Sequence, residues 1–245
     1  MALILCLETA TGVCSVALYR DETLLGIKES AARNVHSALL TTFIDEIIKS
    51  TGVLYADLDA IAVSMGPGSY TGLRIGVASA KGLCYALDKP LIAVSTLQAM
   101  AVGMNDDLRF TIYDLPGKGG NSKLTDRTLF CPMIDARRME VYSGLYNADN
   151  QAIREVRAEI IDEYSFQEFL AGHQVVFGGE GADKCKPMLG NHPNALFLDD
   201  FSTSARFMYP LAAKKIGQQV FENLAYFEPY YLKDFVAGIG KKFGI

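Results

Sequence analysis

Apolar runs separated by polar turns predict a chain built from short strands and longer helices. Two runs, at residues 3–7 and 13–19, flank the polar turn Glu8-Thr-Ala-Thr-Gly12 and indicate two strands joined by a hairpin. Apolar residues four apart, such as Leu39 and Phe43, indicate a helix. The predicted elements of the first half are strands at 3–7, 13–19 and 24–29, a helix over 35–50, a strand at 59–64, a helix over 72–87 and a strand at 91–94.

The second half repeats this order of elements, although it does not repeat the residues. Its predicted elements are strands at 128–134, 139–146 and 153–159, a helix over 163–171, a strand at 174–177, a short helix, a strand at 195–198 and a helix over 203–224. Between the halves, residues 105–127 are polar and rich in Gly and Pro, which indicates a boundary and an exposed loop.

Two βββαβα lobes around a cleft are typical of α/β proteins of the actin/sugar-kinase/Hsp70 (ASKHA, ribonuclease H-like) fold class. We therefore predict an N-terminal lobe at residues 1–104 and a C-terminal lobe at 128–245, joined by the segment 105–127. The last helix and the tail are predicted to pack back on the N-terminal lobe.

Composition and charge exclude several classes of protein. Half of the 245 residues are hydrophobic and 21% are charged, as in packed globular proteins. The N-terminus predicts no signal peptide, and no apolar run approaches the length of a membrane helix. The net charge of −5 disfavours unaided binding of nucleic acid. The five cysteines form no Cys-x-x-Cys pair and predict reduced core thiols in a cytoplasmic protein, and the three histidines are too far apart for a local zinc site.

Polar turns after predicted strands could hold phosphate groups. Gly66-Pro-Gly-Ser-Tyr-Thr-Gly72 leads into a helix N-terminus, which favours an anion, and Glu8-Thr-Ala-Thr-Gly12 could offer hydroxyls to phosphate and its acid to magnesium. Gly178-Gly-Glu-Gly-Ala182 could let backbone lie against an adenosine. The alternatives are tight turns whose glycines bring a helix close to the sheet, and a plain hairpin. The candidate phosphate-facing residues are Thr9, Thr11, Gly66, Gly68, Ser69 and Thr71.

The two helices of the first half are apolar over more of their circumference than one sheet can cover. In 72–87 only Arg74 and Lys81 are charged, and in 35–50 the charges lie at the end. Such helices predict a surface for a protein partner, and the alternative is burial under the second lobe. The predicted contact residues are Leu39, Leu40, Phe43, Ile47, Arg74, Ile75, Ala78, Lys81 and Gly82.

Three segments carry a resemblance to a known family. They are Ile4-Leu-Cys-Leu-Glu-Thr-Ala-Thr-Gly-Val-Cys-Ser-Val-Ala-Leu18, Gly66-Pro-Gly-Ser-Tyr-Thr-Gly-Leu-Arg-Ile-Gly76 and Asp135-Ala-Arg-Arg-Met-Glu-Val-Tyr142. These strings resemble the TsaB (YeaZ) family, and Glu228-Pro-Tyr-Tyr-Leu-Lys-Asp234 resembles its ending. The resemblance implies the two-lobed fold and a place in the bacterial machinery that puts threonylcarbamoyl on adenosine next to the anticodon of tRNAs. It also implies an inactive relative of TsaD, the subunit that performs the transfer.

The positions of the TsaD metal ligands agree with an inactive relative. TsaD-like proteins carry two metal-binding histidines four apart on the helix after the strand that matches 91–94, and here Thr96 and Met100 stand in their places. We therefore expect no catalytic metal. His36 matches a histidine that the family shares and is predicted to cap or to pair across an interface. Glu8 replaces the usual Asp, which weakens the magnesium interpretation.

The resemblance implies a non-catalytic scaffold subunit that pairs with TsaD through helices 35–50 and 72–87, and with itself when TsaD is absent. It further implies a TsaE-like ATPase as a partner, and ATP or ADP at a partner interface if nucleotide binds at all. Contact with tRNA would fall to a partner subunit, because the chain is acidic. An autonomous small-molecule kinase or ATPase of the same fold is the alternative, and the absence of paired histidines disfavours a metallopeptidase.

Overall fold

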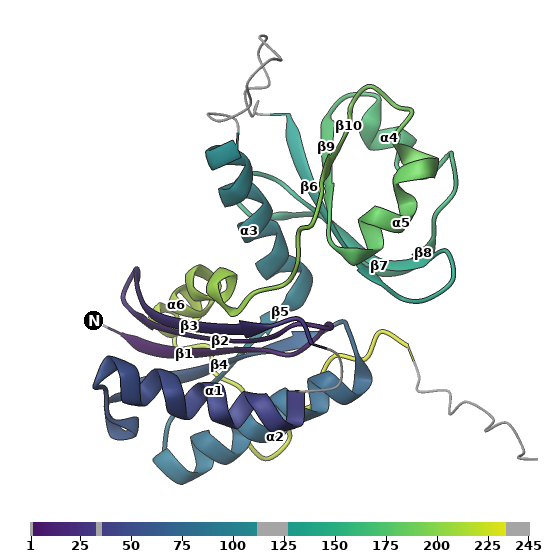
Figure 1. Ribbon diagram of the computed structural model, residues 1–245. Helices are drawn as coiled ribbons and strands as arrows, with labels where there is room; N and C mark the ends of the chain where they lie inside the picture. Colours follow the sequence, from purple (N-terminus) through teal and green to yellow (C-terminus); the bar gives the residue numbers. More distant parts are fainter. Residues whose placement is uncertain (1, 33–35, 112–126, 234–245) are drawn as a thin grey trace, which may run out of the picture.

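The computed structural model describes residues 2–32, 36–111 and 127–233 and divides them between two lobes, each built on a five-stranded sheet (Figure 1). The N-terminal sheet has the order β3-β2-β1-β4-β5, with β1 (Leu3–Glu8), β2 (Cys14–Arg20), β3 (Thr23–Ser30), β4 (Ala60–Gly66) and β5 (Leu91–Ser95). The C-terminal sheet has the order β10-β9-β6-β7-β8, with β6 (Thr128–Asp135), β7 (Glu140–Tyr146), β8 (Ala152–Ile160), β9 (Gln174–Gly178) and β10 (Ala195–Leu198).

Both sheets have one topology. In each lobe the first three strands are antiparallel neighbours, and the last two strands are added in parallel on the other side of the first. Numbered within its own lobe, each sheet therefore has the order 3-2-1-4-5. The predicted α/β fold of two related lobes of the actin/sugar-kinase/Hsp70 type is confirmed.

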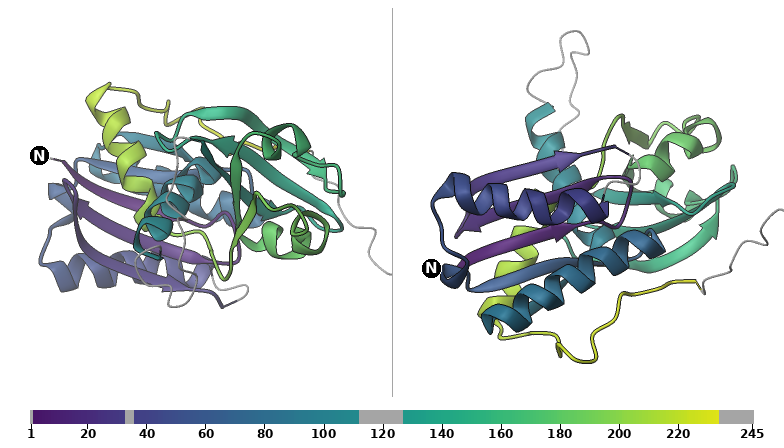
Figure 2. Two further views of the ribbon diagram at one scale, coloured as in Figure 1. Left: turned by 90° about the horizontal axis from the view of Figure 1, so that it is seen from above. Right: turned by 60° about the horizontal axis from the view of Figure 1, so that its bottom comes forward.

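Helices lie in three layers around the two sheets (Figures 1 and 2). One pair covers the outer face of the N-terminal sheet, one pair lies between the sheets, and one pair covers the outer face of the C-terminal sheet. In this order the helices are α1 (His36–Thr51) and α2 (Tyr70–Leu87), α3 (Thr96–Thr111) and α6 (Tyr209–Gly217), and α4 (Gln167–Leu170) and α5 (Glu180–Leu189), with short 3₁₀ helices η1 (Tyr55–Asp57) and η2 (Ala205–Met208).

The central core joins the two lobes. It combines Ile4 and Ala62 of the N-terminal sheet, Leu97 of α3, Phe130 of the C-terminal sheet and Met208 of η2, all fully buried. Because apolar side chains from both sheets share this core, separating the lobes would expose apolar surface to water. The base of the cleft between the lobes is thereby fixed.

The helix predicted over 163–171 is reduced to the single turn α4. The Ser165 hydroxyl donates a hydrogen bond to the Asp162 carboxylate at 2.8 Å, and the Asp162 N–H donates to Ser165 Oγ at 3.0 Å. Phe166 then has a left-handed backbone with a φ of 64°. This local turn offers the backbone an alternative to helix, so the helix begins only after it.

The helix predicted over 203–224 was wrong in its extent, because α6 ends at Gly217. Gln219 has a left-handed φ of 56°, and the Glu222 N–H donates to the Leu91 carbonyl of the edge strand β5 at 2.9 Å. The chain after Gly217 therefore pairs with the edge of the sheet instead of continuing as a helix. We call residues 218–233 the C-terminal strap; it runs alongside α2 (Figure 2, right).

The segments around the predicted boundary also differ from the expectation. Residues from 105 onward were expected to form a loop, but α3 continues to Thr111, and 112–126 lie outside the described residues. After the C-terminal sheet the chain returns to the N-terminal lobe, where Tyr209 of α6 stacks on Tyr19 of β2 with ring centroids 4.6 Å apart. No helix in the described part of the chain is both long and apolar enough to span a membrane.

Candidate functional site

The two lobes enclose a cleft of about 1020 Å³. The turns after β1 and β4 and the start of α2 form one wall, and the β6–β7 hairpin and the start of α5 form the other. Four of the six candidate phosphate-facing residues line this cleft: Thr11, Gly68, Ser69 and Thr71. The other two do not, because Thr9 is fully buried and Gly66 lines a separate cavity of about 280 Å³.

The glycine-rich turn brings α2 directly against the end of β1. A Cβ atom at Gly72 would lie 2.1 Å from the carbonyl oxygen of Thr9. Thr9 Oγ1 donates to the Gly72 carbonyl at 2.9 Å, and the Thr9 N–H donates to Ser64 Oγ at 3.3 Å. The Thr9 hydroxyl therefore binds the helix to the sheet instead of facing a phosphate. At this position the tight-turn alternative describes the structure.

Gly72→Ala is expected to lower the free energy of unfolding by about 1–3 kcal/mol, because its Cβ would overlap a backbone atom that cannot rotate away. Gly82→Ala, in the same helix, is the control: its Cβ would meet no atom within 4 Å, and the change should stabilise the chain by about 0.5–1 kcal/mol. Urea denaturation of both variants at low protein concentration measures the difference. Equal effects of the same sign would contradict the close approach.

Side chains on the N-terminal wall are engaged within the chain. Ser69 caps α2, its Oγ accepting the Gly72 N–H at 3.3 Å, and Thr11 Oγ1 shares a hydrogen bond with Thr203 Oγ1 at 2.7 Å. Glu8 lies below the wall, 1% exposed, with its carboxylate accepting the Ala10 N–H at 2.6 Å. It does not present its oxygens to the cleft, so the structure gives no support to a magnesium ion there.

The opposite wall is a charged hairpin. Asp135 forms an ion pair with Lys184 and accepts the N–H of Arg137 at 2.8 Å. Lys184 Nζ also donates to the carbonyls of Arg138 at 2.8 Å and Glu140 at 2.6 Å. Arg137 and Arg138 have left-handed backbones, with φ of 70° and 52°, and both side chains are exposed at the cleft. The hairpin thus presents two guanidinium groups at the rim.

The turn Gly178-Gly-Glu-Gly-Ala182 serves packing. Gly179 has a φ of 105°, and a Cβ atom there would lie 2.4 Å from the Met133 carbonyl oxygen. Of the five residues in the turn, Glu180 lines the cleft and the glycines do not. The structure therefore offers no open strip of backbone here for an adenosine.

One face of α2 is exposed to solvent. We call this the outer α2 face, and it consists of the exposed residues Arg74, Ala78, Gly82 and Tyr85. Tyr85 is 84% exposed. Lys81 lies on another side, where its Nζ donates to two carbonyls of the C-terminal strap, those of Ala225 at 3.3 Å and Phe227 at 3.1 Å. The strap, and not the second lobe, covers that side of α2. Lys81 is therefore not part of the outer α2 face, although the sequence predicted it as a contact residue.

The other predicted contact residues divide between core and surface. Leu40 and Ile47 are each 1% exposed because they pack on the N-terminal sheet, so they leave the predicted contact surface. Leu39, Phe43 and Ile75 are half-buried beside the same core, and Ile75 also lines the cleft.

His36 acts within its own chain. It is 9% exposed at the start of α1, and its Nε2 donates to the Thr11 carbonyl at 2.9 Å. The hydrogen bond fixes the beginning of α1 to the turn after β1. This contact is intramolecular, but it is not a helix cap, because the ring donates to a carbonyl outside α1 and binds no backbone N–H of that helix.

Thr96 and Met100 begin α3 as core residues. They are 0% and 2% exposed, and the Thr96 hydroxyl has no hydrogen-bond partner in the part of the chain that the structure describes. Met100 packs against the turn at Gly179. Among the described residues, no three His, Cys, Asp or Glu side chains gather in a geometry that could hold a metal ion. The five cysteines are buried free thiols.

The strap supplies cleft residues that the sequence did not single out. Tyr230, Tyr231, Leu232 and Lys233 line the cleft mouth. The one signal in the sequence is the tyrosine-rich ending, which matches the family pattern but by itself points to no site. Residues 218–224 of the strap were expected to be helical, and the tail was predicted to pack on the N-terminal lobe, but no residue of it was predicted to line the cleft.

Comparisons with known proteins identify the family. A model of TsaD, the tRNA N6-adenosine threonylcarbamoyltransferase, matches residues 18–113. The tRNA threonylcarbamoyladenosine biosynthesis protein TsaB of Escherichia coli K12 is 30% identical over 243 residues, which cover 96% of each chain. The chain belongs to the TsaB family. The TsaB protein of Bacillus subtilis is 33% identical over 62% of this chain and 58% of its own.

A solved structure of the same family has the same fold. YeaZ from Pseudomonas aeruginosa superimposes with a TM-score of 0.76 at 24% identity, covering 95% of this chain and 100% of its own. The agreement extends over both lobes and confirms the two-lobed architecture. The resemblance inferred from the sequence strings is confirmed.

Proposed function

We propose that the protein is a non-catalytic scaffold subunit in tRNA threonylcarbamoyladenosine biosynthesis that pairs with a TsaD-like catalytic subunit. The outer α2 face carries the proposal. Its small residues Ala78 and Gly82 let another helix approach closely, and Arg74 and Tyr85 are residue types enriched at interfaces. TsaD shares the lobe that contains this helix, since its model matches residues 18–113. A related lobe, or a second copy of this chain when TsaD is absent, would pack in the same way.

The core positions of Thr96 and Met100 support a subunit without its own catalytic metal. Neither a hydroxyl nor a thioether replaces imidazole as a ligand of a catalytic divalent ion. Both side chains are also buried, so neither is open to a metal that carries water or substrate. Chemistry would thus belong to the partner.

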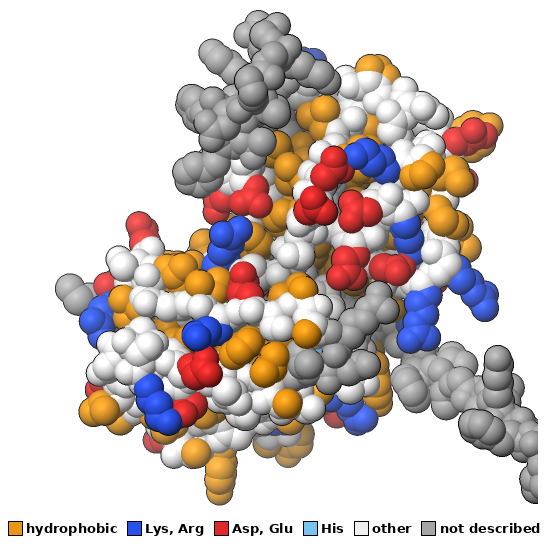
Figure 3. Space-filling view, viewed as in Figure 1, with side chains coloured by type: hydrophobic (Ala, Val, Ile, Leu, Met, Phe, Trp, Pro, Cys, Tyr) orange, Lys and Arg blue, Asp and Glu red, His pale blue; other side chains and the backbone are white. Residues whose placement is uncertain are grey.

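The surface charge of the chain bears on which subunit contacts the tRNA. On the face seen in Figure 3, acidic side chains gather over the C-terminal lobe. The pKa of Asp183 is raised, first by burial and then by the nearby carboxylates of Asp199 and Asp200. Such a surface repels phosphodiesters, so contact with tRNA would fall to the partner.

A TsaE-like ATPase would join this pair, with ATP or ADP at a shared interface. The reduced thiols fit assembly in the cytoplasm.

The cleft favours a second candidate, an autonomous small-molecule kinase or ATPase, because its volume of about 1020 Å³ is that of a ligand site. Against this candidate, the Thr9 hydroxyl and the glycine turns are engaged in packing. ATP hydrolysis by the lone chain with added magnesium discriminates the two. Turnover comparable to that of small-molecule kinases would favour the second candidate.

Ala78→Glu is expected to weaken pairing with the TsaD-like subunit by roughly 30-fold, or about 2 kcal/mol. The reason is that a carboxylate at the centre of the outer α2 face would be buried in the complex, whereas in the free chain it is solvated beside Arg74. Size-exclusion chromatography and titration calorimetry of the mixed subunits measure the change.

Ala78→Ser is the matched control, because it keeps a small side chain without a charge and should pair nearly normally. Circular dichroism should show that both variants fold, since Ala78 is exposed. Normal pairing of Ala78→Glu would place the interface elsewhere. Equal losses in both variants would show that size, and not charge, is limiting.

A further inference from the structure

The C-terminal strap is fastened to the N-terminal lobe at three separate places. Near its start, the Glu222 N–H donates to the Leu91 carbonyl at 2.9 Å. In its middle, carbonyls of the strap accept from Lys81 of α2, and Leu224 and Phe227 pack on the core under that helix. The third fastening is distinct, because it lies at the cleft and reaches both lobes.

We call residues 230–233, at this third place, the latch. On the N-terminal side, the Tyr230 N–H donates to the Met65 carbonyl at 2.7 Å, at the end of β4. On the C-terminal side, Lys233 forms an ion pair with Glu140 and lies 6.0 Å from the ring centre of Tyr142. All four latch residues line the cleft. The latch therefore bridges the two lobes across the cleft mouth.

One exposed residue of α2 connects the latch to the outer α2 face. Arg74 lies with its guanidinium carbon 4.8 Å from the ring centre of Tyr70. Burial raises the pKa of the Tyr231 hydroxyl, and the positive charge of Arg74 nearby opposes that rise. The Tyr70 and Tyr231 rings are in contact, with centroids 4.9 Å apart. Arg74 belongs to the outer α2 face and Tyr231 belongs to the latch. The cluster of Arg74, Tyr70 and Tyr231 therefore connects the two.

We infer that the latch couples the outer α2 face to the cleft: a partner that recruits Arg74 releases Tyr231, and the cleft mouth opens. The inference rests on the proposed function in taking the outer α2 face as the partner surface. The guanidinium that reaches a partner carboxylate must leave its position over the Tyr70 ring, beside Tyr231, because one side chain cannot serve both. Ala78 and Gly82, one and two turns along, carry no side chain that could substitute for it.

Three contacts of the latch do not involve Arg74: the hydrogen bond of the Tyr230 N–H to the Met65 carbonyl, the ring contact of Tyr231 with Tyr70, and the ion pair of Lys233 with Glu140. The ion pair of Lys233 with Glu140 joins side chains that are 39% and 25% exposed, and exposed pairs stabilise little. Tyr230 is 43% exposed. By contrast, the middle of the strap is held by apolar packing that does not involve Arg74. Opening is therefore confined to residues 230–233, while the rest of the strap stays in place.

Hydrogen–deuterium exchange of the full chain tests the latch. In Arg74→Ala, the amides of residues 230–233 are expected to exchange about tenfold faster, since Tyr230 N–H protection depends on the closed latch. The Glu222 amide, bonded to Leu91, is the internal reference and should not change. Arg20→Ala, which removes an exposed charge elsewhere on the N-terminal lobe, is the matched control. Unchanged exchange at Tyr230, or a parallel rise at Glu222, would overturn the inference.

Adding the TsaD-like subunit to the wild-type chain tests the coupling. Protection of the α2 amides together with faster exchange at residues 230–233 is the expected result. Protection of α2 without faster exchange at the latch would refute the coupling while leaving the proposed function intact. Absence of protection on α2 would instead refute the proposed function, and the Arg74→Ala comparison on the lone chain would still decide whether Arg74 holds the latch.

Discussion

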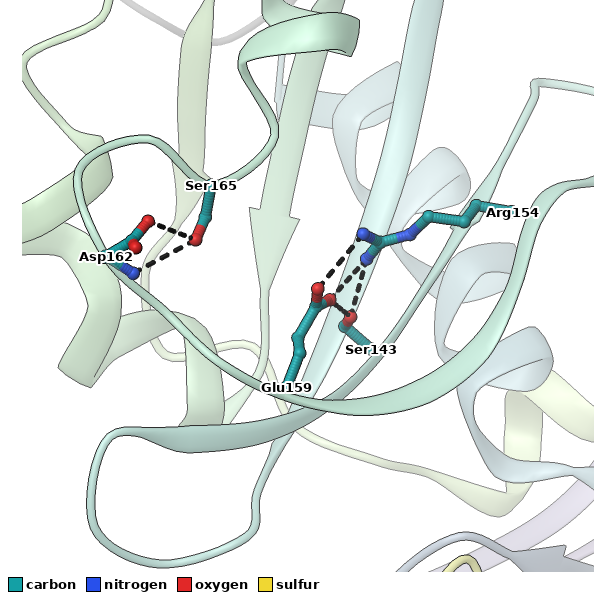
Figure 4. A network of polar contacts seen from close by, with 5 residues as sticks. All are labelled: Ser143, Arg154, Glu159, Asp162 and Ser165. Atoms are coloured by element: carbon teal, nitrogen blue, oxygen red, sulfur yellow. Dashed lines mark hydrogen bonds and ion pairs between the residues drawn. The ribbon is translucent and has the colours of Figure 1, made fainter.

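Arg154→Ala should lower the free energy of unfolding by about 3–5 kcal/mol, because it leaves a partly buried carboxylate without its counter-charge. Arg154 and Glu159 lie on β8 with side chains 9% and 20% exposed (Figure 4). The guanidinium donates to both carboxylate oxygens, at 2.5 and 3.2 Å, and to Ser143 Oγ at 2.8 Å. It also lies 4.4 Å from the ring centre of Phe166, so the variant loses packing as well as charge.

Two further variants separate these contributions. Arg157→Ala removes an exposed arginine from the same strand and should change the free energy of unfolding by less than about 0.5 kcal/mol. The double variant Arg154→Met with Glu159→Leu should recover most of the loss, because it removes both charges together. Urea denaturation followed by circular dichroism measures all three. Similar losses for Arg154→Ala and Arg157→Ala would contradict the special role of the buried pair.

Strand positions and topology could be predicted because they depend on local pattern. The run at 3–7 became Leu3–Glu8, and the run at 91–94 became Leu91–Ser95, since a short apolar run bounded by polar turns is typical of a buried strand. The repeat of element order in the two halves then led to the two-lobed fold. The family strings added the glycine turn, whose spacing is set by contact between helix and strand at Gly72.

Features that depend on distant partners could not be predicted in this way. Helical periodicity identified the apolar stripes of α1, but it could not show that Leu40 and Ile47 face the sheet while Leu39 and Phe43 lie at its margin. The strap is a second example, because its course is decided by backbone pairing with Leu91, far away in the sequence.

At the candidate site too, the sequence shows which residue types are present but not which partners they meet in the fold. Thr11, one of the two threonines after β1 predicted to face a phosphate, lines the cleft. Thr9 does not, because its hydroxyl finds the Gly72 carbonyl, which lies on another element. Residue type thus predicts what a side chain can donate, whereas the fold decides which acceptor it meets.

Glu8→Gln is expected to stabilise the protein by about 3 kcal/mol above neutral pH and to have little effect in acid. Glu8 is 1% exposed, and burial raises its pKa from 4.5 to about 7, against the opposing hydrogen bonds from Ala10, Ser64 and Thr9. In the folded chain the carboxyl group thus binds its proton more tightly than in the unfolded chain. Its contribution to stability is complete below pH 4.5 and is lost as the pH rises through about 7.

The substituted amide would keep the oxygen that accepts the Ala10 N–H but cannot ionise, so Glu8→Gln removes this pH dependence and preserves the contact. Urea denaturation of both proteins at pH 5 and pH 8.5 isolates the effect, because all other titrating groups cancel in the difference. Glu22→Gln, at an exposed turn, is the control and should change stability little at either pH. A difference between wild type and Glu8→Gln that is the same at both pH values would show that Glu8 ionises in the folded chain as freely as in the unfolded one. In that case, burial beneath the turn at residues 9–12 would not destabilise the ionised Glu8 carboxylate.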